Sequence, residues 1–108
     1  MRKYVVFEKH AQKEIRTFPQ TVQIKFKAIL KILEEKGELH YPDAKKIEHK
    51  NNLFEIRIKH RGEWRAIYTY STRNYIIILS AFYKKTQKTP KEELEKAIRR
   101  LNFLKGKI

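Results

Sequence analysis

The sequence contains no cysteine, and only three glycines and three prolines in 108 residues. The absence of cysteine excludes disulfide bonds and thiolate metal sites, and the scarcity of glycine and proline argues against a disordered or fibrous chain. Apolar runs are short, as at residues 75–79, so we expect no segment that crosses a membrane. The N-terminal residues lack the charged segment and following apolar run of a secretion signal, which predicts a cytoplasmic protein.

Acidic residues are also few. The chain has 12 Asp and Glu residues against 26 Lys and Arg, which gives a formal net charge of +14. Such self-repulsion opposes folding and is usually tolerated because the partner is a polyanion, with nucleic acid as the leading candidate. The 41% hydrophobic fraction is enough for one core, so we expect a single domain over residues 1–108.

The order of elements follows from the spacing of apolar residues. Residues 3–8 are short, β-branched and aromatic, which predicts a first strand. Spacings of three and four from residue 10 predict two helices that meet near Pro19 and end near Gly37. Residues 38–52 are expected to form a connecting loop, with a turn of structure around residues 45–48.

Three strands and a helix are expected in the second half of the chain. The strands are predicted at residues 54–59, 64–70 and 75–83, with Gly62 in the first turn. Thr89 and Glu92 form a capping-box pattern around Pro90, which predicts the start of a last helix. The resulting order, β-α-α-β-β-β-α, is that of an α+β fold.

Basic and aromatic residues are interleaved in this second half. Between residues 56 and 91 there are nine Lys or Arg against one acid, Glu63. Aromatic rings stack on unpaired bases while cations hold phosphates, so the segment predicts a surface for single-stranded RNA. The alternative is a lysine-rich edge that discourages strand pairing, with the aromatics in the core. Because a hydroxyl tolerates water, we expect Tyr68, Tyr70 and Tyr83 to be the exposed rings.

The usual catalytic motifs are missing. There is no Gly-rich phosphate loop, and the four histidines have no metal-ligand spacing, so we expect neither a metal nor a cofactor. RNA carries its own nucleophile, the 2′-hydroxyl, and its cleavage needs a base, cations for the phosphorane and an acid for the 5′-oxygen. A lysine crowded by other cations has a lowered pKa and can be that base, which predicts a metal-independent ribonuclease.

Two segments resemble a known family. LFEIRIKHRGEWRAIYTY (residues 53–70) and ILSAFYKKTQKTPKEELEKAI (residues 78–98) resemble the RelE/ParE toxin superfamily, in particular its phage-derived HigB-like branch. The resemblance implies a RelE-like two-layer fold, with an antiparallel sheet, the first strand beside the fourth, and the N-terminal helices on one face. It also implies a toxin of a type II toxin–antitoxin system that cleaves mRNA in the ribosomal A site, on the opposite, concave face.

The resemblance also suggests the site residues. Arg57 matches a catalytic-face lysine of RelE, Arg65 a phosphate-contacting arginine, and Lys84 and Lys85 another basic group. Tyr83 is the candidate for the catalytic tyrosine by proximity alone. Glu55 departs from the pattern, because RelE has a basic residue there, and His60 in the turn is a further candidate base. The remaining RNA-binding candidates are basic or aromatic neighbours of these residues: Lys59, Arg61, Tyr68, Arg73 and Lys88.

The resemblance implies two partners, mRNA on the 70S ribosome and a HigA-like helix-turn-helix antitoxin that neutralises the basic surface. Two other functions stay open. ParE-like relatives share the fold and inhibit DNA gyrase without cutting RNA, and an inert RNA-binding module would have the same composition.

Overall fold

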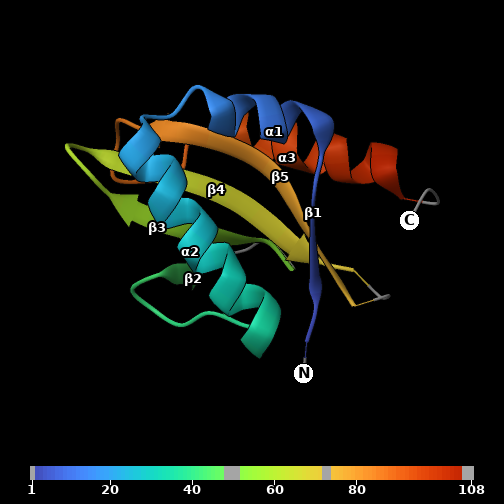
Figure 1. Ribbon diagram of the computed structural model, residues 1–108. Helices are drawn as coiled ribbons and strands as arrows, with labels where there is room; N and C mark the ends of the chain where they lie inside the picture. Colours follow the sequence, from blue (N-terminus) through green and yellow to red (C-terminus); the bar gives the residue numbers. More distant parts are fainter. Residues whose placement is uncertain (1, 48–51, 72–73, 106–108) are drawn as a thin grey trace.

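The computed structural model describes residues 2–47, 52–71 and 74–105, and the elements follow the predicted order with one addition (Figure 1). The three helices are α1 (Lys9–Arg16), α2 (Gln20–Lys36) and α3 (Lys91–Leu104). The five strands are β1 (Tyr4–Phe7), β2 (Ala44–Lys46), β3 (Phe54–Lys59), β4 (Glu63–Tyr70) and β5 (Tyr75–Lys84). The expected α+β class is therefore confirmed.

The strands form one sheet in the order β1-β5-β4-β3-β2. The first strand lies beside the long strand β5, as expected, but it runs parallel to β5, whereas the other neighbours are antiparallel. The sheet is thus mixed, and the expectation of a fully antiparallel sheet is wrong at β1. The direction of a strand relative to its neighbour leaves no local signature in a sequence. Two helices follow β1 before the chain re-enters the sheet, so only the tertiary arrangement decides that β1 runs parallel to β5.

Strand β2 lies in the segment that was predicted to be a loop. It has three residues, AKK, and pairs with β3 so that Lys45 stands opposite Glu55. Its composition has none of the β-branched or aromatic residues that mark strands, so β2 depends on its neighbour rather than on propensity. The addition matters because it extends the sheet beside the charged residues of β3.

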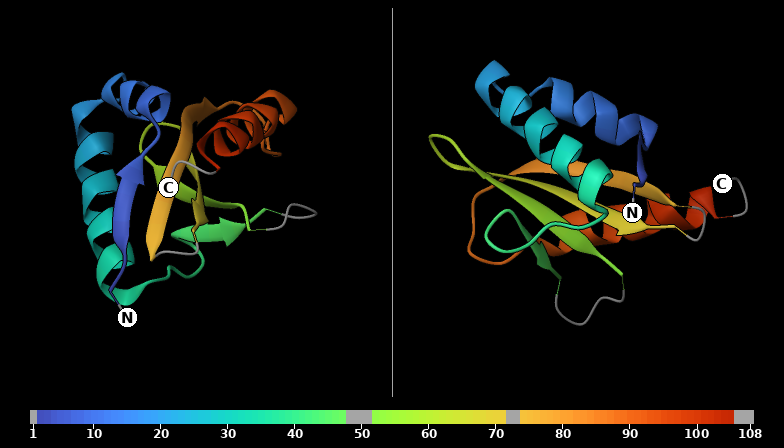
Figure 2. Two further views of the ribbon diagram at one scale, coloured as in Figure 1. Left: turned by 90° about the vertical axis from the view of Figure 1, so that its right-hand side faces the viewer. Right: turned by 60° about the horizontal axis from the view of Figure 1, so that its bottom comes forward.

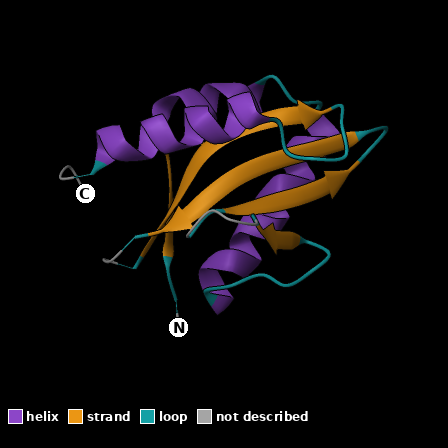
Figure 3. Ribbon diagram, turned by 180° about the vertical axis from the view of Figure 1, so that it is seen from behind, coloured by secondary structure: helices purple, strands orange, loops and turns teal. Residues whose placement is uncertain are grey.

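Helices cover both faces of the sheet (Figure 2). Helices α1 and α2 pack on one face around a core that includes Phe26, Ile56 and Ile78. Helix α3 packs on the other face against Ile67 and Leu79. Seen from the α3 side, the end of the β3–β4 hairpin projects beyond this helix (Figure 3). None of the helices in the described ranges is long and apolar enough to span a bilayer.

The helix ends follow from local chemistry. The Glu8 carboxylate accepts hydrogen bonds from the first backbone N–H groups of α1, and Gly37 ends α2 in the left-handed conformation at φ +79°. Helix α3 begins after Pro90 without a side-chain cap. The predicted capping box is wrong, because the Thr89 hydroxyl donates instead to the Glu55 carboxylate at 2.7 Å.

Glu14 ties α1 to β5 and α3. Its carboxylate accepts two hydrogen bonds from Arg100, at 2.9 and 3.0 Å, and one from the backbone N–H of Ala81 at 3.1 Å. Lys96 lies 3.2 Å away on the same carboxylate. Burial by itself raises the pKa of Glu14, but these hydrogen bonds outweigh it and hold the pKa below the usual 4.5.

We therefore expect the free energy of unfolding to fall as the pH drops below about 4.5. In that range the unfolded chain binds protons that folded Glu14 does not, so stability is present above the unfolded pKa and is lost as the pH falls through the folded one. Glu14→Gln should cost about 2 kcal/mol at pH 7 and flatten this dependence. Urea titrations of wild type and Glu14→Gln between pH 3 and pH 7 measure the free energy of unfolding at each pH. If the two proteins lose stability in parallel as the pH falls, Glu14 is not the source of the pH dependence.

Gly62 is needed in the β3–β4 turn for two reasons. Its φ is +135°, which side chains rarely adopt, and a Cβ added there would collide with the ring of Tyr83. Gly62→Ala should therefore lower the free energy of unfolding by about 1–3 kcal/mol. The double variant Gly62→Ala/Tyr83→Ala separates the causes in denaturant titrations, because it removes the collision and leaves the strain. Wild-type stability of Gly62→Ala would contradict both.

Candidate functional site

A group of charged side chains occupies the sheet face that α3 leaves open. We call Glu55, Arg57, Arg65 and Lys84 the sheet cluster. Arg57 and Arg65 are directly opposite each other on β3 and β4, and Lys84 is the last residue of β5. Period-two alternation in each strand brings these side chains to one face, with the apolar partners of α1 and α2 on the other. The alternation in residues 54–59 predicted this separation for β3.

Glu55 lies at the centre of the sheet cluster and is only 4% exposed. Its Oε1 atom is 3.6 Å from Nε of Arg65 and 3.9 Å from Nζ of Lys84, and its Oε2 atom accepts the hydrogen bond from Thr89. A buried carboxylate between two buried cations reduces their mutual repulsion. The departure from the RelE pattern at this position therefore has a structural reason.

Arg65 is 2% exposed, so it is a buried cation. Its NH2 group donates to Glu63 at 2.9 Å, and its NH1 group donates to the carbonyl of Trp64 at 3.0 Å. The bond from Arg65 lowers the pKa of Glu63, which stays ionised. Nε of Arg65 is buried without a hydrogen bond in the structure. This geometry holds the guanidinium rigidly in one place.

Lys84 has the chemistry expected of a base. Its side chain is 9% exposed. Burial lowers the pKa of Lys84, and the nearby charges of Arg65, Arg57 and Lys45 lower it further, against an opposing effect of Glu55. A larger share of neutral amine is therefore present near neutral pH than in an exposed lysine, which is the form that accepts a proton.

Two cavities flank the sheet cluster. The first, of about 370 Å³, lies between β2 and the segment that leads into α3, and Lys45, Glu55, Lys84, Lys88 and Thr89 line it. The second, of about 250 Å³, lies between the β3–β4 hairpin and the turn before β2, and it is lined by Arg57, Arg65 and Tyr41 among others. Both are open, so a polyanionic chain can reach the buried cations.

The structure brings together only some of the predicted site residues. Arg57, Arg65 and Lys84 share the sheet cluster, and Lys88 lines the first cavity. Tyr83 lies on the opposite face, where its ring packs against Trp64 at 4.7 Å, which in turn contacts Phe18. Tyr83 is 42% exposed there, as predicted, but it is separated from the cluster by the sheet.

The other predicted site residues differ in how far they are exposed to solvent. Tyr68 is 1% exposed and stacks on Phe54 in the core under α2, so its predicted exposure is wrong. Burial raises the pKa of Tyr68, and its buried ring cannot stack on a nucleobase of RNA. Tyr70 is half-buried beside Tyr68. Besides Tyr83, the exposed candidates in the described ranges are Lys59, Arg61, Lys85 and Lys88, and Arg73 lies outside the described residues.

His60 lies in the turn as predicted, and its carbonyl accepts a hydrogen bond from the Trp64 indole at 2.9 Å.

The sequence did not identify three residues that line the two cavities. Its pattern placed Lys45 in a loop and Thr89 at a helix cap, and it indicated no role for Tyr41. Pro42 and Asp43 did signal a turn, but nothing local shows that this turn folds back over β3.

Comparisons with known proteins identify the family and the fold of the chain. The family described as "Phage derived protein Gp49-like (DUF891)" matches residues 13–102. A search of curated proteins gave no significant match. Among solved structures, a mutant of the E. coli toxin RelE in the free state is 19% identical, with a TM-score of 0.73 over 94% of this chain and 99% of that one.

Two complexes are also similar. A chain of the archaeal RelE–RelB complex from Pyrococcus horikoshii is 24% identical, with a TM-score of 0.60 over 79% of this chain and 98% of that chain. A chain of the toxin–antitoxin complex RelBE2 from Mycobacterium tuberculosis is 14% identical, with a TM-score of 0.57 over 78% of this chain and 100% of that one. At these identities the structures establish the shared fold.

Proposed function

The chain belongs to the phage-derived Gp49-like family and has the RelE fold, and from this we propose that it is the toxin of a type II toxin–antitoxin system that cuts mRNA in the ribosomal A site. The observation that carries the proposal is Lys84, a buried lysine with a lowered pKa beside Arg57 and Arg65. A base with neighbouring fixed cations is what RNA transesterification requires.

The proposed reaction uses these groups in sequence. The neutral amine of Lys84 removes the proton of the 2′-hydroxyl, and the 2′-oxygen attacks the adjacent phosphorus. Arg57 and Arg65 stabilise the charge of the phosphorane. The bond from phosphorus to the 5′-oxygen then breaks, and that oxygen takes a proton from a cationic side chain of the first cavity, such as Lys45. The products are a 2′,3′-cyclic phosphate and a 5′-hydroxyl.

The test is primer-extension mapping of an mRNA with the purified protein in EDTA, with and without translating ribosomes. Cuts at codon positions that need ribosomes support the proposal. Cuts in free RNA of the same efficiency would contradict ribosome dependence, and no cut in either sample would contradict the nuclease.

A toxin of this fold that does not cut RNA is the second candidate. The observation in its favour is Glu55, because its carboxylate lies between Arg65 and Lys84, where a phosphate would otherwise meet both cations. A DNA gyrase supercoiling assay tests this ParE-like reading. Inhibition of gyrase without RNA cleavage would replace the first proposal with the second.

An antitoxin partner is part of the proposal, because RelE-like chains have been solved as complexes with RelB. For this chain we propose a HigA-like protein with a helix-turn-helix domain and an acidic segment that complements the +14 charge. Co-expression of the gene next to this one should give a stable complex that lacks toxicity, and the free toxin should arrest growth.

A further inference from the structure

We propose that the second cavity, which we call the Tyr41 cavity, binds one unpaired nucleobase of the RNA, with a preference for guanine. The proposal rests on the RNA-binding part of the proposed function, because it places a base beside the phosphate held by the sheet cluster. The cavity is formed by a turn over the β3–β4 hairpin, and Tyr41, Asp43, Arg57, Lys59, Glu63 and Arg65 line it.

Tyr41 is an exposed ring that is held in place. It is 72% exposed, which is unusual for an aromatic side chain of a small domain. The guanidinium of Arg57 lies 5.2 Å from the centre of its ring, in cation–π contact. Unpaired bases stack on tyrosine rings and on guanidinium planes, so this pair is a ready platform for one.

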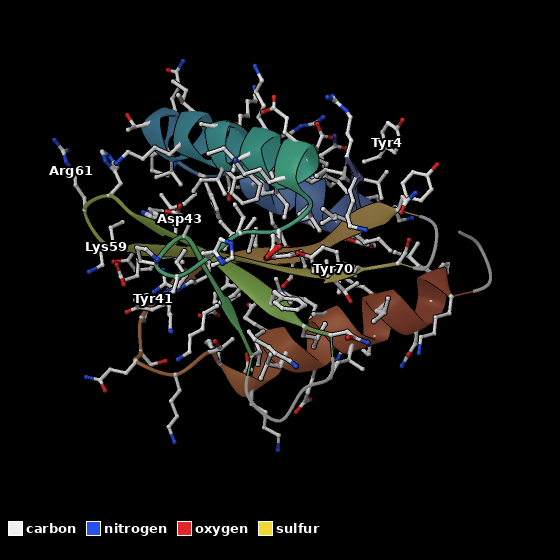
Figure 4. All side chains as sticks on the ribbon, turned by 90° about the horizontal axis from the view of Figure 1, so that it is seen from below. Tyr4, Tyr41, Asp43, Lys59, Arg61 and Tyr70 are labelled. Atoms are coloured by element: carbon white, nitrogen blue, oxygen red, sulfur yellow. The ribbon has the colours of Figure 1, made fainter. Side chains whose placement is uncertain are left out.

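The turn that carries Tyr41 is fixed against β3. The backbone N–H of Arg57 donates to the carbonyl of Asp43 at 2.9 Å, and the N–H of Asp43 donates to the carbonyl of His40 at 2.9 Å. In Figure 4 the labelled residues Tyr41, Asp43, Lys59 and Arg61 gather at one end of the sheet, and Tyr4 lies at the other end. The platform is therefore preorganised, which reduces the entropy lost on binding.

Arg57 offers the cavity a donor without an acceptor. Nε of Arg57 is buried and makes no hydrogen bond in the structure, whereas Arg65 is already engaged by Glu55, Glu63 and the carbonyl of Trp64. Buried donors are usually paired. Arginine donors pair with O6 and N7 of guanine, the commonest specific contact between arginine and a base. An acceptor-rich base edge would satisfy the Arg57 donor that the protein leaves unpaired.

Carboxylates on the rim supply the opposite chemistry. Glu63 is held by Arg65 in the ionised state, and Asp43 lines the same cavity. Ionised carboxylates only accept hydrogen bonds, and the Watson–Crick edge of guanine offers two neighbouring donors, N1–H and the 2-amino group. Uracil offers one donor, and adenine and cytosine offer a single amino group each. The volume, about 250 Å³, lies below the roughly 300–1,000 Å³ of drug-sized pockets, as one base requires.

The test measures binding without cleavage. Fluorescein-labelled 2′-O-methyl hexanucleotides lack the nucleophile, so they stay intact whether or not the protein is a nuclease. Four probes carry G, A, C or U at one position in a uridine background, and fluorescence anisotropy at low salt gives their affinities. We expect the G probe to bind most tightly, Tyr41→Ala to weaken it about tenfold, and Tyr41→Phe to bind within twofold of wild type.

Two further variants make the test specific. Asp43→Asn should reduce the preference for G over U, and Tyr4→Ala, which removes an exposed ring at the far end of the sheet, should change nothing. Equal affinity for the four probes, or equal losses for Tyr41→Ala and Tyr4→Ala, would overturn the proposal. A G preference that depends on Tyr41 in a protein that fails to cut mRNA would retain the base site and reject the nuclease.

Discussion

Lys84→Met is expected to lower ribosome-dependent mRNA cleavage by about 100-fold or more, because positioned proton transfer contributes on the order of 10²–10⁴ in rate. The variant removes the amine and keeps an unbranched chain of similar length in the space it leaves. It also removes a buried cation from a position where burial already disfavours the charge, so the fold should be retained. Single-turnover cleavage on stalled ribosomes, quantified by primer extension, measures the rate.

The pH dependence provides a second readout of Lys84. The base must be neutral, so the wild-type rate should rise with pH until it passes the lowered pKa of Lys84 and then level off. Lys84→Arg keeps the charge and cannot become neutral, so it should be as inactive as Lys84→Met.

The matched control is Lys36→Met, at the end of α2 on the other side of the sheet, where the lysine is exposed. It removes the same charge from a surface that is not proposed to meet the scissile phosphate. A Lys84→Met rate within threefold of wild type would contradict the assignment of the base. Equal losses for Lys84→Met and Lys36→Met would show that net charge alone is responsible.

Glu55→Gln is expected to lower the free energy of unfolding by about 3–5 kcal/mol, the usual cost of removing one partner of a buried ion pair. Glutamine keeps the size of the side chain and an acceptor for Thr89, but it removes the negative charge between Arg65 and Lys84. For a domain of about 100 residues this corresponds to a fall in Tm of roughly 12 °C or more.

The double variant Glu55→Leu/Arg65→Met tests the cause. If the loss comes from an uncompensated charge, replacing both buried partners by apolar side chains should restore most of the stability. Glu95→Gln is the matched control, because Glu95 is exposed and its ion pair with Lys91 spans 3.9 Å on the surface of α3. It should change the free energy of unfolding by less than about 1 kcal/mol. If Glu55→Gln and Glu95→Gln lowered the free energy of unfolding equally, the central role of Glu55 in stability would be contradicted.

Together these experiments separate stability from chemistry. Glu55 is expected to act on folding through Arg65, whereas Lys84 is expected to act on rate. A Glu55→Gln protein that is folded at low temperature and still cuts mRNA would assign Glu55 to the structure of the site alone. A folded but inactive protein would show that Glu55 also positions Lys84.

The elements with regular spacing were predictable. Both N-terminal helices, the Gly37 end of α2 and the strands β3 to β5 lie where apolar periodicity places them, because burial of one face imposes that period on the sequence. The RelE-like fold and the family were accessible from the two segments around β3–β4 and β5. The placement of the charged side chains of β3 on one sheet face also followed from alternation.

Tertiary structure decided what depends on contacts between distant segments. Strand β2 forms because β3 offers an unpaired edge, and it places Lys45 opposite Glu55. Thr89 does not cap α3, because its hydroxyl donates instead to the buried carboxylate of Glu55, which lies 34 residues earlier in the chain. Tyr68 is buried and Tyr83 is not, although both are tyrosines in basic strands, because helix α2 covers one end of that face.

The sequence by itself determined the class of fold, the position of the regular elements and the presence of a basic sheet surface, since each depends on local propensity, periodicity and charge. Only the tertiary structure decided which of the basic groups are buried, that Glu55 lies between Arg65 and Lys84, and that Tyr41 stands over Arg57. These features arise from the desolvation of charges and from packing across the sheet, and both depend on the three-dimensional distances between residues that are far apart in the chain.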